Sequence, residues 1–116
     1  MSTGGPRRLV KLAGMALTAA VLVVRPGTAV TAARTHTIFI DKMEFGPVPK
    51  NVRAGDVIVW VNRDIFRHTA TARDRSFNID LAPSARGKTV VKRRGTIAFY
   101  CTYHPGMKGR IVVADK

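Results

Sequence analysis

The chain has 116 residues, with 20 Lys and Arg against 7 Asp and Glu, and its formal net charge is +13. This length accommodates one domain and a terminal segment. The sequence holds one cysteine, Cys101, which excludes an intramolecular disulfide and leaves its sulfur for packing, redox or metal chemistry. A charged fraction of 23% and a hydrophobic fraction of 46% are those of a globular protein, which excludes wholesale disorder, coiled coils and collagen.

The N-terminal residues follow the order of a secretory signal peptide. Arg7, Arg8 and Lys11 provide the positively charged start, and an uncharged run of 13 residues follows over 12–24. Pro26 then interrupts any helix, and small residues continue beyond it. The apolar run is shorter than the roughly 20 residues that span a bilayer, which argues against the alternative of an uncleaved membrane anchor.

We therefore expect residues 1–33 to be a signal peptide that is removed by cleavage near Ala32 or Ala33. Residues 34–116 then form one mature domain with 16 basic and 7 acidic residues, a formal net charge of +9. Such a protein is periplasmic or secreted, with no stable membrane insertion once the signal is cleaved. In an oxidising compartment a free thiol is exposed to oxidation unless something occupies it, so the single cysteine needs an explanation.

The mature region consists of short runs with the composition of β-strands, separated by turns rich in Gly, Pro and Asn. Residues 57–61 are five consecutive apolar, mostly β-branched positions, as expected of a strand buried on much of its surface. The other expected strands are 37–40, 68–72, 77–79, 88–92, 97–101 and 110–114. Because no segment has a sustained helical period, these roughly seven strands predict an all-β fold, either a β-sandwich or a small barrel.

The candidate functional residues lie in the loop before the last strand and in one segment upstream. Cys101, His104 and Met107 follow one another at intervals of three residues, so one tight loop can turn all three side chains toward a common centre. His68 opens a strand after the turn at 62–64, where a neighbouring loop can supply a fourth donor. Two imidazoles, a thiolate and a weak thioether are the ligands of blue-copper electron-transfer sites, so we expect one copper ion here.

Each of these residues has an ordinary structural explanation when it is taken alone. A cysteine at a strand end is often a small buried hydrophobe, and a lone methionine often fills a gap in a core. Other chemistries fit the complete set less well. A catalytic Cys–His pair needs an orienting third group, structural zinc does not use a thioether, and haem attachment needs two cysteines.

Four segments of the mature region carry a resemblance to a known family. They are 43–45, 52–64, 68–70 and 95–109, and together with the intervening residues they cover nearly all of 36–114. On these residues the chain resembles the cupredoxins, specifically the short amicyanin and plastocyanin-like group. The compact spacing of Cys, His and Met resembles that of amicyanin.

The resemblance implies an eight-stranded Greek-key β-sandwich with a type 1 copper site at one end. It assigns His68, Cys101, His104 and Met107 as the metal ligands. It also implies a carrier of single electrons that cycles between Cu(I) and Cu(II), and not an enzyme. A periplasmic copper-holding or copper-delivery protein is the alternative, because the same ligands would serve it.

The chain departs from the amicyanin pattern at three positions near the site. Thr69 stands where amicyanins and plastocyanins usually place the Asn that ties the two ligand loops together, so we expect a weaker tie. The backbone N–H of Thr69 can still donate to the thiolate. Tyr103 and Gly106 replace the Pro and Phe of amicyanin, which changes the surface around the site. We expect His104 to present one ring edge to solvent between Tyr103 and Pro105.

We expect the partners to be acidic redox proteins, because the mature chain is strongly basic. The cations proposed to attract them are Arg63, Arg67, Lys92, Arg93 and Arg94. Nucleic acid is not an expected partner, because the sequence has no basic patch interleaved with aromatic residues. We expect the mature protein to be a monomer.

Overall fold

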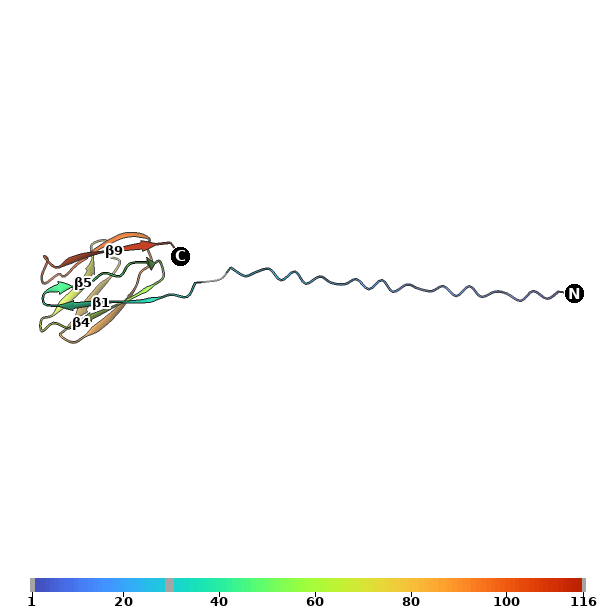
Figure 1. The fold of residues 1–116 in the computed structure, drawn as a ribbon, viewed down its shortest axis with the longest axis horizontal. Coiled ribbons are helices and arrows are strands. Elements are labelled where there is room, and N and C mark those ends of the chain that lie inside the picture. Colours follow the sequence, from blue (N-terminus) through green and yellow to red (C-terminus); the bar gives the residue numbers. More distant parts are fainter. Residues whose placement is uncertain (1, 29–30, 116) are drawn as a thin grey trace.

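A computed structural model describes residues 2–28 and 31–115 of the chain. Residues 2–28 form no helix or strand, and this segment runs outward from the folded part (Figure 1). Among the described residues, no helix has the length and apolar character needed to cross a membrane. The expected signal peptide, residues 1–33, includes Met1 and residues 29–30, which lie outside the described residues.

The described residues form nine strands in two sheets. One sheet has the order β2-β1-β4-β7, and the other has the order β3-β9-β8-β5-β6. The strands are β1 (Thr35–Asp41), β2 (Glu44–Phe45), β3 (Val52–Arg53), β4 (Val57–Asn62), β5 (His68–Ala72), β6 (Asn78–Leu81), β7 (Arg86–Val90), β8 (Gly95–Tyr100) and β9 (Lys108–Ala114). This arrangement confirms the all-β sandwich expected from the sequence.

The core lies between the two sheets and is built around aromatic side chains. Trp60 of β4 and Phe99 of β8 are fully buried, and their ring centroids lie 5.1 Å apart in an edge-to-face arrangement. Phe45 of β2 adds a second edge contact to Phe99 at 4.8 Å. Such contacts add to the free energy gained by burying the rings, so the aromatic cluster fixes how the two sheets face each other.

Most expected strands occur where the sequence predicts them, with three differences. β7 spans Arg86–Val90 instead of 88–92, because Val91 leaves the strand and its N–H donates to the carbonyl oxygen of Asp56 at 2.9 Å. Cys101 lies just after β8, outside the strand. The two-residue strands β2 and β3 are additional, because runs of two residues carry no recognisable period.

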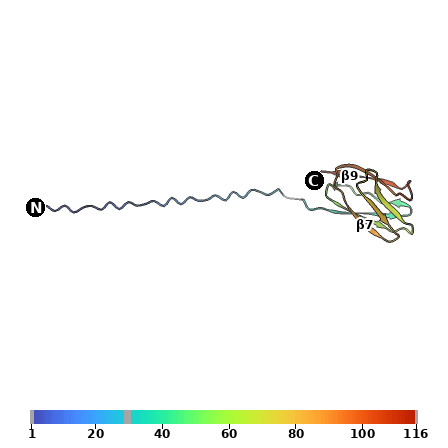
Figure 2. The same cartoon turned by 180° about the vertical axis from the view of Figure 1, so that it is seen from behind.

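The topology brings the two candidate ligand segments to the same end of the sandwich. β1 and β4 run parallel, so both finish at the same end of the sandwich. A short loop after β4 leads to the start of β5, which therefore lies at that end too. β8 runs antiparallel to β5, with Thr71 opposite Tyr100, and therefore delivers Cys101 to that end. The start of β1 and the end of β9 lie at the opposite end, as both views show (Figures 1 and 2).

Candidate metal centre

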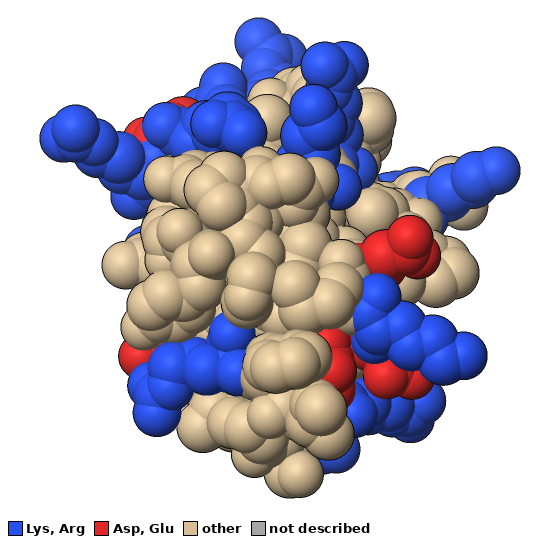
Figure 3. All heavy atoms as spheres, turned by 90° about the vertical axis from the view of Figure 1, so that its left-hand side faces the viewer, with Lys and Arg blue, Asp and Glu red and all other residues tan. Residues whose placement is uncertain are grey.

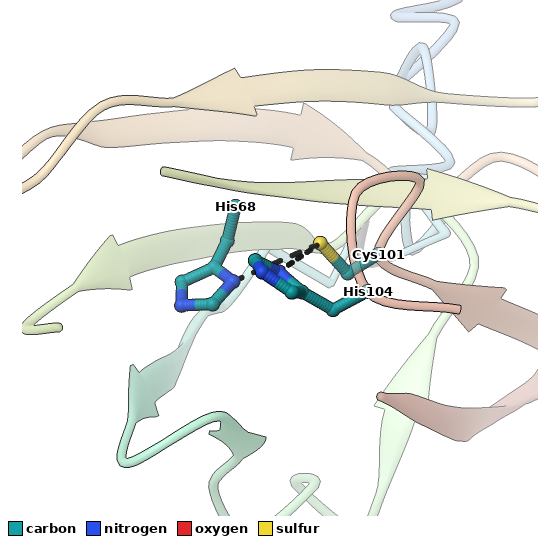
Figure 4. Close-up of side chains that lie close together, drawn as sticks. All are labelled: His68, Cys101 and His104. Atoms are coloured by element: carbon teal, nitrogen blue, oxygen red, sulfur yellow. Dashed lines mark hydrogen bonds between the residues drawn. The ribbon is translucent and has the colours of Figure 1, made fainter. Parts of the chain in front are cut away.

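His68, Cys101 and His104 converge at this end of the sandwich. Their ligand atoms all lie within 4.8 Å of one another. The Sγ of Cys101 is 3.7 Å from the Nδ1 of His68 and 3.7 Å from the Nδ1 of His104 (Figure 4). His68 and Cys101 are completely buried, whereas His104 is half-buried. Two imidazole nitrogens and one sulfur therefore face a common point at the edge of the core.

The His68 ring is oriented by a carboxylate four residues earlier in the chain. The Oδ2 of Asp64 lies 2.9 Å from the Nε2 of His68, which leaves Nδ1 to face Cys101. Asp64 is itself fixed, because its backbone N–H donates to the Oδ1 of Asn62 at 2.9 Å. The hydrogen bond with His68, together with that from the Met43 N–H, lowers the pKa of Asp64. Carboxylates that orient metal-binding histidines in this way also raise the basicity of the ligand nitrogen.

This role of Asp64 is not apparent from the sequence, where the residue is interpreted as part of a turn. The buried side chain of Asn62 completes the turn, because its Nδ2 donates to the carbonyl oxygens of Phe66 at 2.8 Å and Leu81 at 3.0 Å. The interval of four residues between Asp64 and His68 is the available sequence signal, and it is a weak one because turns commonly contain Asp.

Cys101 is held by backbone hydrogen bonds from both ligand segments. Its N–H donates to the carbonyl oxygen of Met107 at 3.0 Å, and its Sγ accepts a hydrogen bond from the N–H of Thr69 at 3.3 Å. The expected donation from Thr69 to the sulfur is therefore present. Thr69 also ties the two segments together, because its Oγ1 accepts a hydrogen bond from the Thr102 N–H at 2.9 Å.

Met107 lies buried at the end of the loop that carries Cys101 and His104. It is 7% exposed and packs within the hydrophobic core cluster. Its backbone N–H donates to the carbonyl oxygen of His104 at 2.9 Å and so closes the loop. The loop therefore brings the backbone of Met107 back to that of Cys101.

The donor atoms fit a soft metal ion. A buried thiol with two imidazole nitrogens in reach is the kind of set that copper and zinc bind, and a methionine in the same loop is a residue type that copper sites use. Hydrogen bonds outside the donor set hold both buried donors in place, as is usual for metal sites. The residues present therefore fit copper.

Uncharged side chains are exposed next to His104, which is half-buried. The Phe66 and His104 ring centroids lie 6.4 Å apart, and Phe66 is 49% exposed. Ile65 and Tyr103 are also exposed. Figure 3 shows this end of the molecule as an uncharged area bordered mostly by Lys and Arg, with some Asp and Glu among them. We call Ile65, Phe66, Tyr103 and Pro105 the apolar rim of the site.

Most cations expected to attract a partner are already engaged within the chain. Arg67 pairs with Asp80 at 2.8 Å, and Arg93 pairs with Asp74 at 2.6 Å. The Cζ of Arg63 lies 3.5 Å from the centre of the Phe39 ring. Arg94 pairs with Asp115 at 3.3 Å. The three ion pairs reduce the free positive charge at Arg67, Arg93 and Arg94. The contact of Arg63 with the Phe39 ring leaves its charge uncompensated.

Comparisons with known proteins agree with this fold. No family model matches the chain. The amicyanins of Paracoccus denitrificans and Paracoccus versutus are 26% and 25% identical to it, over 89 and 83 residues. Each comparison covers 64% of this chain, which spans 61% of the length of each of these relatives.

Solved structures have the same fold. A reduced variant of amicyanin has a TM-score of 0.63 at 22% identity, covering 72% of this chain and 86% of that one. A purple cupredoxin from Nitrosopumilus maritimus has a TM-score of 0.61 at 22% identity, covering 67% and 98%. The two sheets and the site at their end therefore define a cupredoxin fold. In sequence the chain is amicyanin-like.

Proposed function

We propose that this chain is a small exported electron carrier in which His68, Cys101, His104 and Met107 hold one copper ion. The convergence of two histidines on a buried cysteine carries the proposal. The similarity to amicyanins supports it, and one similar amicyanin structure is described with Cu(I). Bound copper would supply a one-electron Cu(I)/Cu(II) couple, and the protein would supply a fixed set of ligands.

The residues around the donors keep their positions rigid. Asp64 fixes the His68 ring, and Thr69 donates to the sulfur of Cys101. A hydrogen bond to the sulfur withdraws electron density from it and helps to set the reduction potential. Because these groups belong to the packed end of the sandwich, the ligands need to move little when the charge of the site changes.

His104 is the proposed exit for the electron. Its half-buried ring lies beside Phe66 at the apolar rim, whereas His68 and Cys101 are completely buried. A partner docked on the rim comes closer to the ligand set through His104 than through any of the buried ligands. This arrangement suits electron transfer and gives a substrate no direct access to the buried donors, so we propose a carrier and not an enzyme.

We propose that residues 1–33 direct export and are then removed, so that the carrier works in the periplasm or outside the cell. The arginines and lysine before the apolar run, and the small residues after it, support this proposal.

The proposed partner is an acidic redox protein that covers the apolar rim. The mature region has a formal net charge of +9, and Figure 3 shows positive side chains around the uncharged area. Lys42 and Lys108 form no ion pair within the described part of the chain, unlike Arg67 and Arg93. Complementary charge of this kind speeds association more than it tightens the complex.

The alternative is a protein that delivers copper. The two functions differ in whether the protein passes on an electron or the copper ion itself. The copper-loaded protein is cycled repeatedly between a mild reductant and a mild oxidant while a copper chelator is present in excess. A carrier retains its copper through many cycles. Transfer of the ion to the chelator within the first reduced phases would instead favour delivery.

A further inference from the structure

At the end of the sandwich opposite the candidate metal centre, the buried carboxylate of Asp56 binds the backbone of Arg34, the residue just before β1. Asp56 lies in the turn before β4 and is 3% exposed. Its Oδ1 accepts the backbone N–H of Arg34 at 3.0 Å, and its Oδ2 accepts the N–H of Arg53 at 2.9 Å. The Nε2 of His36 lies 2.8 Å from the same Oδ2. Asp56 therefore anchors the chain just before β1 begins at Thr35.

The residues that precede Arg34 lie beside this carboxylate. Thr31, Ala32 and Ala33 line a hollow of about 220 Å³ together with residues 53–56. Ala33 and Thr31 also provide small residues one and three positions before the bond between Ala33 and Arg34. This is the pattern that signal peptidases accept at their cleavage site.

We propose that the leader is cut between Ala33 and Arg34 and that Asp56 binds the α-ammonium group that the cut creates. A signal peptidase adds water across the peptide bond. The carbonyl carbon of Ala33 takes the hydroxyl group, and the nitrogen of Arg34 takes the remaining hydrogen. The new carboxyl group then loses its proton to the solvent, and the new amine takes one up. The proposal rests on the export proposed above and is independent of copper.

The cut changes the charge of one atom that already lies in contact with Asp56. In the uncut chain the Arg34 nitrogen is a neutral amide that donates to Oδ1. In the cut chain the same nitrogen is a cation, so a hydrogen bond with one charged partner becomes an ion pair with two, which is stronger. A nearby carboxylate also favours the protonated form of an amine. The other charges at Asp56 are the guanidinium of Arg34, 3.7 Å away, and the His36 ring when it is protonated.

The ion pair with Asp56 forms only if the peptide bond between Ala33 and Arg34 is the one that is cut. A cut between Ala32 and Ala33 would leave the Arg34 nitrogen as an amide and would place the α-amino group one residue away. Cleavage at the proposed bond therefore adds an ion pair at the base of β1 that the precursor lacks.

The test uses the full chain, exported from a bacterial host with its own leader. The mass of the exported protein identifies its first residue. The rate at which acetic anhydride acetylates the α-amino group near neutral pH is then followed by peptide mass spectrometry, with the exposed Lys50 as internal reference. Asp56→Asn removes the proposed partner, and Asp80→Asn removes an equal charge from an exposed position in β6.

We expect Arg34 to be the first residue of the exported protein. We expect the α-amino group to be acetylated about tenfold more slowly in the unchanged protein than in Asp56→Asn, and Asp80→Asn should behave like the unchanged protein. If Asp56→Asn does not fold, the unchanged protein unfolded in urea replaces it, and the same tenfold difference from the folded protein is expected. A different first residue, or equal rates in the compared forms, would overturn the proposal.

Discussion

The backbone N–H of Thr69 lies 3.3 Å from the Sγ of Cys101, although the two residues are 32 positions apart in the chain. The Thr69 side chain makes a second connection between the same segments, because its Oγ1 accepts the Thr102 N–H at 2.9 Å. One residue at the start of β5 thus supports the sulfur and holds the loop that carries it.

Replacing Thr69 separates its two roles. Thr69→Val keeps the backbone donor to Cys101 and removes the hydroxyl acceptor of the Thr102 N–H. The loss of such a hydrogen bond costs about 1 kcal/mol, so the copper-free variant should unfold at lower urea concentration. Thr69→Ser keeps the hydroxyl and should remain close to the unchanged protein. Equal unfolding midpoints for the Val and Ser variants would refute the role of the hydroxyl.

Asp64 should control how tightly the site holds its metal. Asp64→Ala removes the oxygen that lies 2.9 Å from the Nε2 of His68 and lets the ring turn. Loss of such an orienting group lowers metal affinity by about 10- to 100-fold. Competition with a chelator of known affinity measures the change. The control is Asp41→Ala, which removes a carboxylate that bonds the neighbouring Lys42 N–H. An equal effect of both substitutions would contradict a specific role for Asp64.

The sequence predicts the ligands of the site better than the hydrogen bonds that hold those ligands in place. Cys101, His104 and His68 can be recognised because their residue types and spacing fit one ligand set, and the structure brings them within 4.8 Å. The role of Asp64 cannot be recognised from the sequence, because a carboxylate in a turn is common and the fold determines that His68 is its partner. The ion pair of Arg67 with Asp80 is likewise formed by strand register, which pairs β5 with β6.

The same limit applies to the fold. The run at 57–61 identifies a buried strand by composition, and β4 forms there. The bounds of β7 depend instead on Val91, which turns away to bond Asp56, a residue 35 positions earlier in the chain. Short strands such as β2 owe their existence to a neighbouring strand, β1, and not to their own two residues.

Gly109 leaves room for the aromatic core below the metal loop. A Cβ atom at this position of β9 would lie only 2.4 Å from the Cζ of Phe99, whose ring is completely buried. Gly109→Ala should therefore destabilise the fold by about 1 to 3 kcal/mol through overpacking. Gly106→Ala is the matched control in the metal loop, because a Cβ there meets nothing within 4 Å. Thermal unfolding should distinguish the two variants, and equal melting temperatures would show that the core accommodates the methyl group.

Asp56 should make the fold sensitive to acid. Burial raises its pKa, but the N–H groups of Arg34 and Arg53, the His36 hydrogen bond and the Arg34 charge outweigh burial and lower the pKa from 3.8 to about 2. A carboxyl whose pKa is lower in the folded protein stabilises it above pH 3.8, and this contribution is lost as the pH falls through about 2.

The comparison of Asp56→Asn with the unchanged protein tests this dependence. At pH 7 the variant should be less stable, by about 1 to 3 kcal/mol, because it weakens the binding of several buried donors. The difference should shrink steadily below pH 4, since the carboxyl becomes protonated in both the folded and the unfolded chain. Urea unfolding of both proteins between pH 7 and pH 2 measures the difference in their free energies of unfolding. A difference that stays constant down to pH 2 would mean that Asp56 acts through packing and not through its charge.

The most direct test of a copper centre at His68, Cys101 and His104 is the visible spectrum of the exported protein during titration with Cu(II). We predict an intense thiolate-to-copper charge-transfer band that grows until one equivalent is bound, and its loss in Cys101→Ser, since a hydroxyl does not replace a soft thiolate. The folded state of the variant is verified by its far-ultraviolet circular dichroism. A protein that stays colourless with Cu(II), or a band that persists without the Cys101 sulfur, would contradict the proposed site.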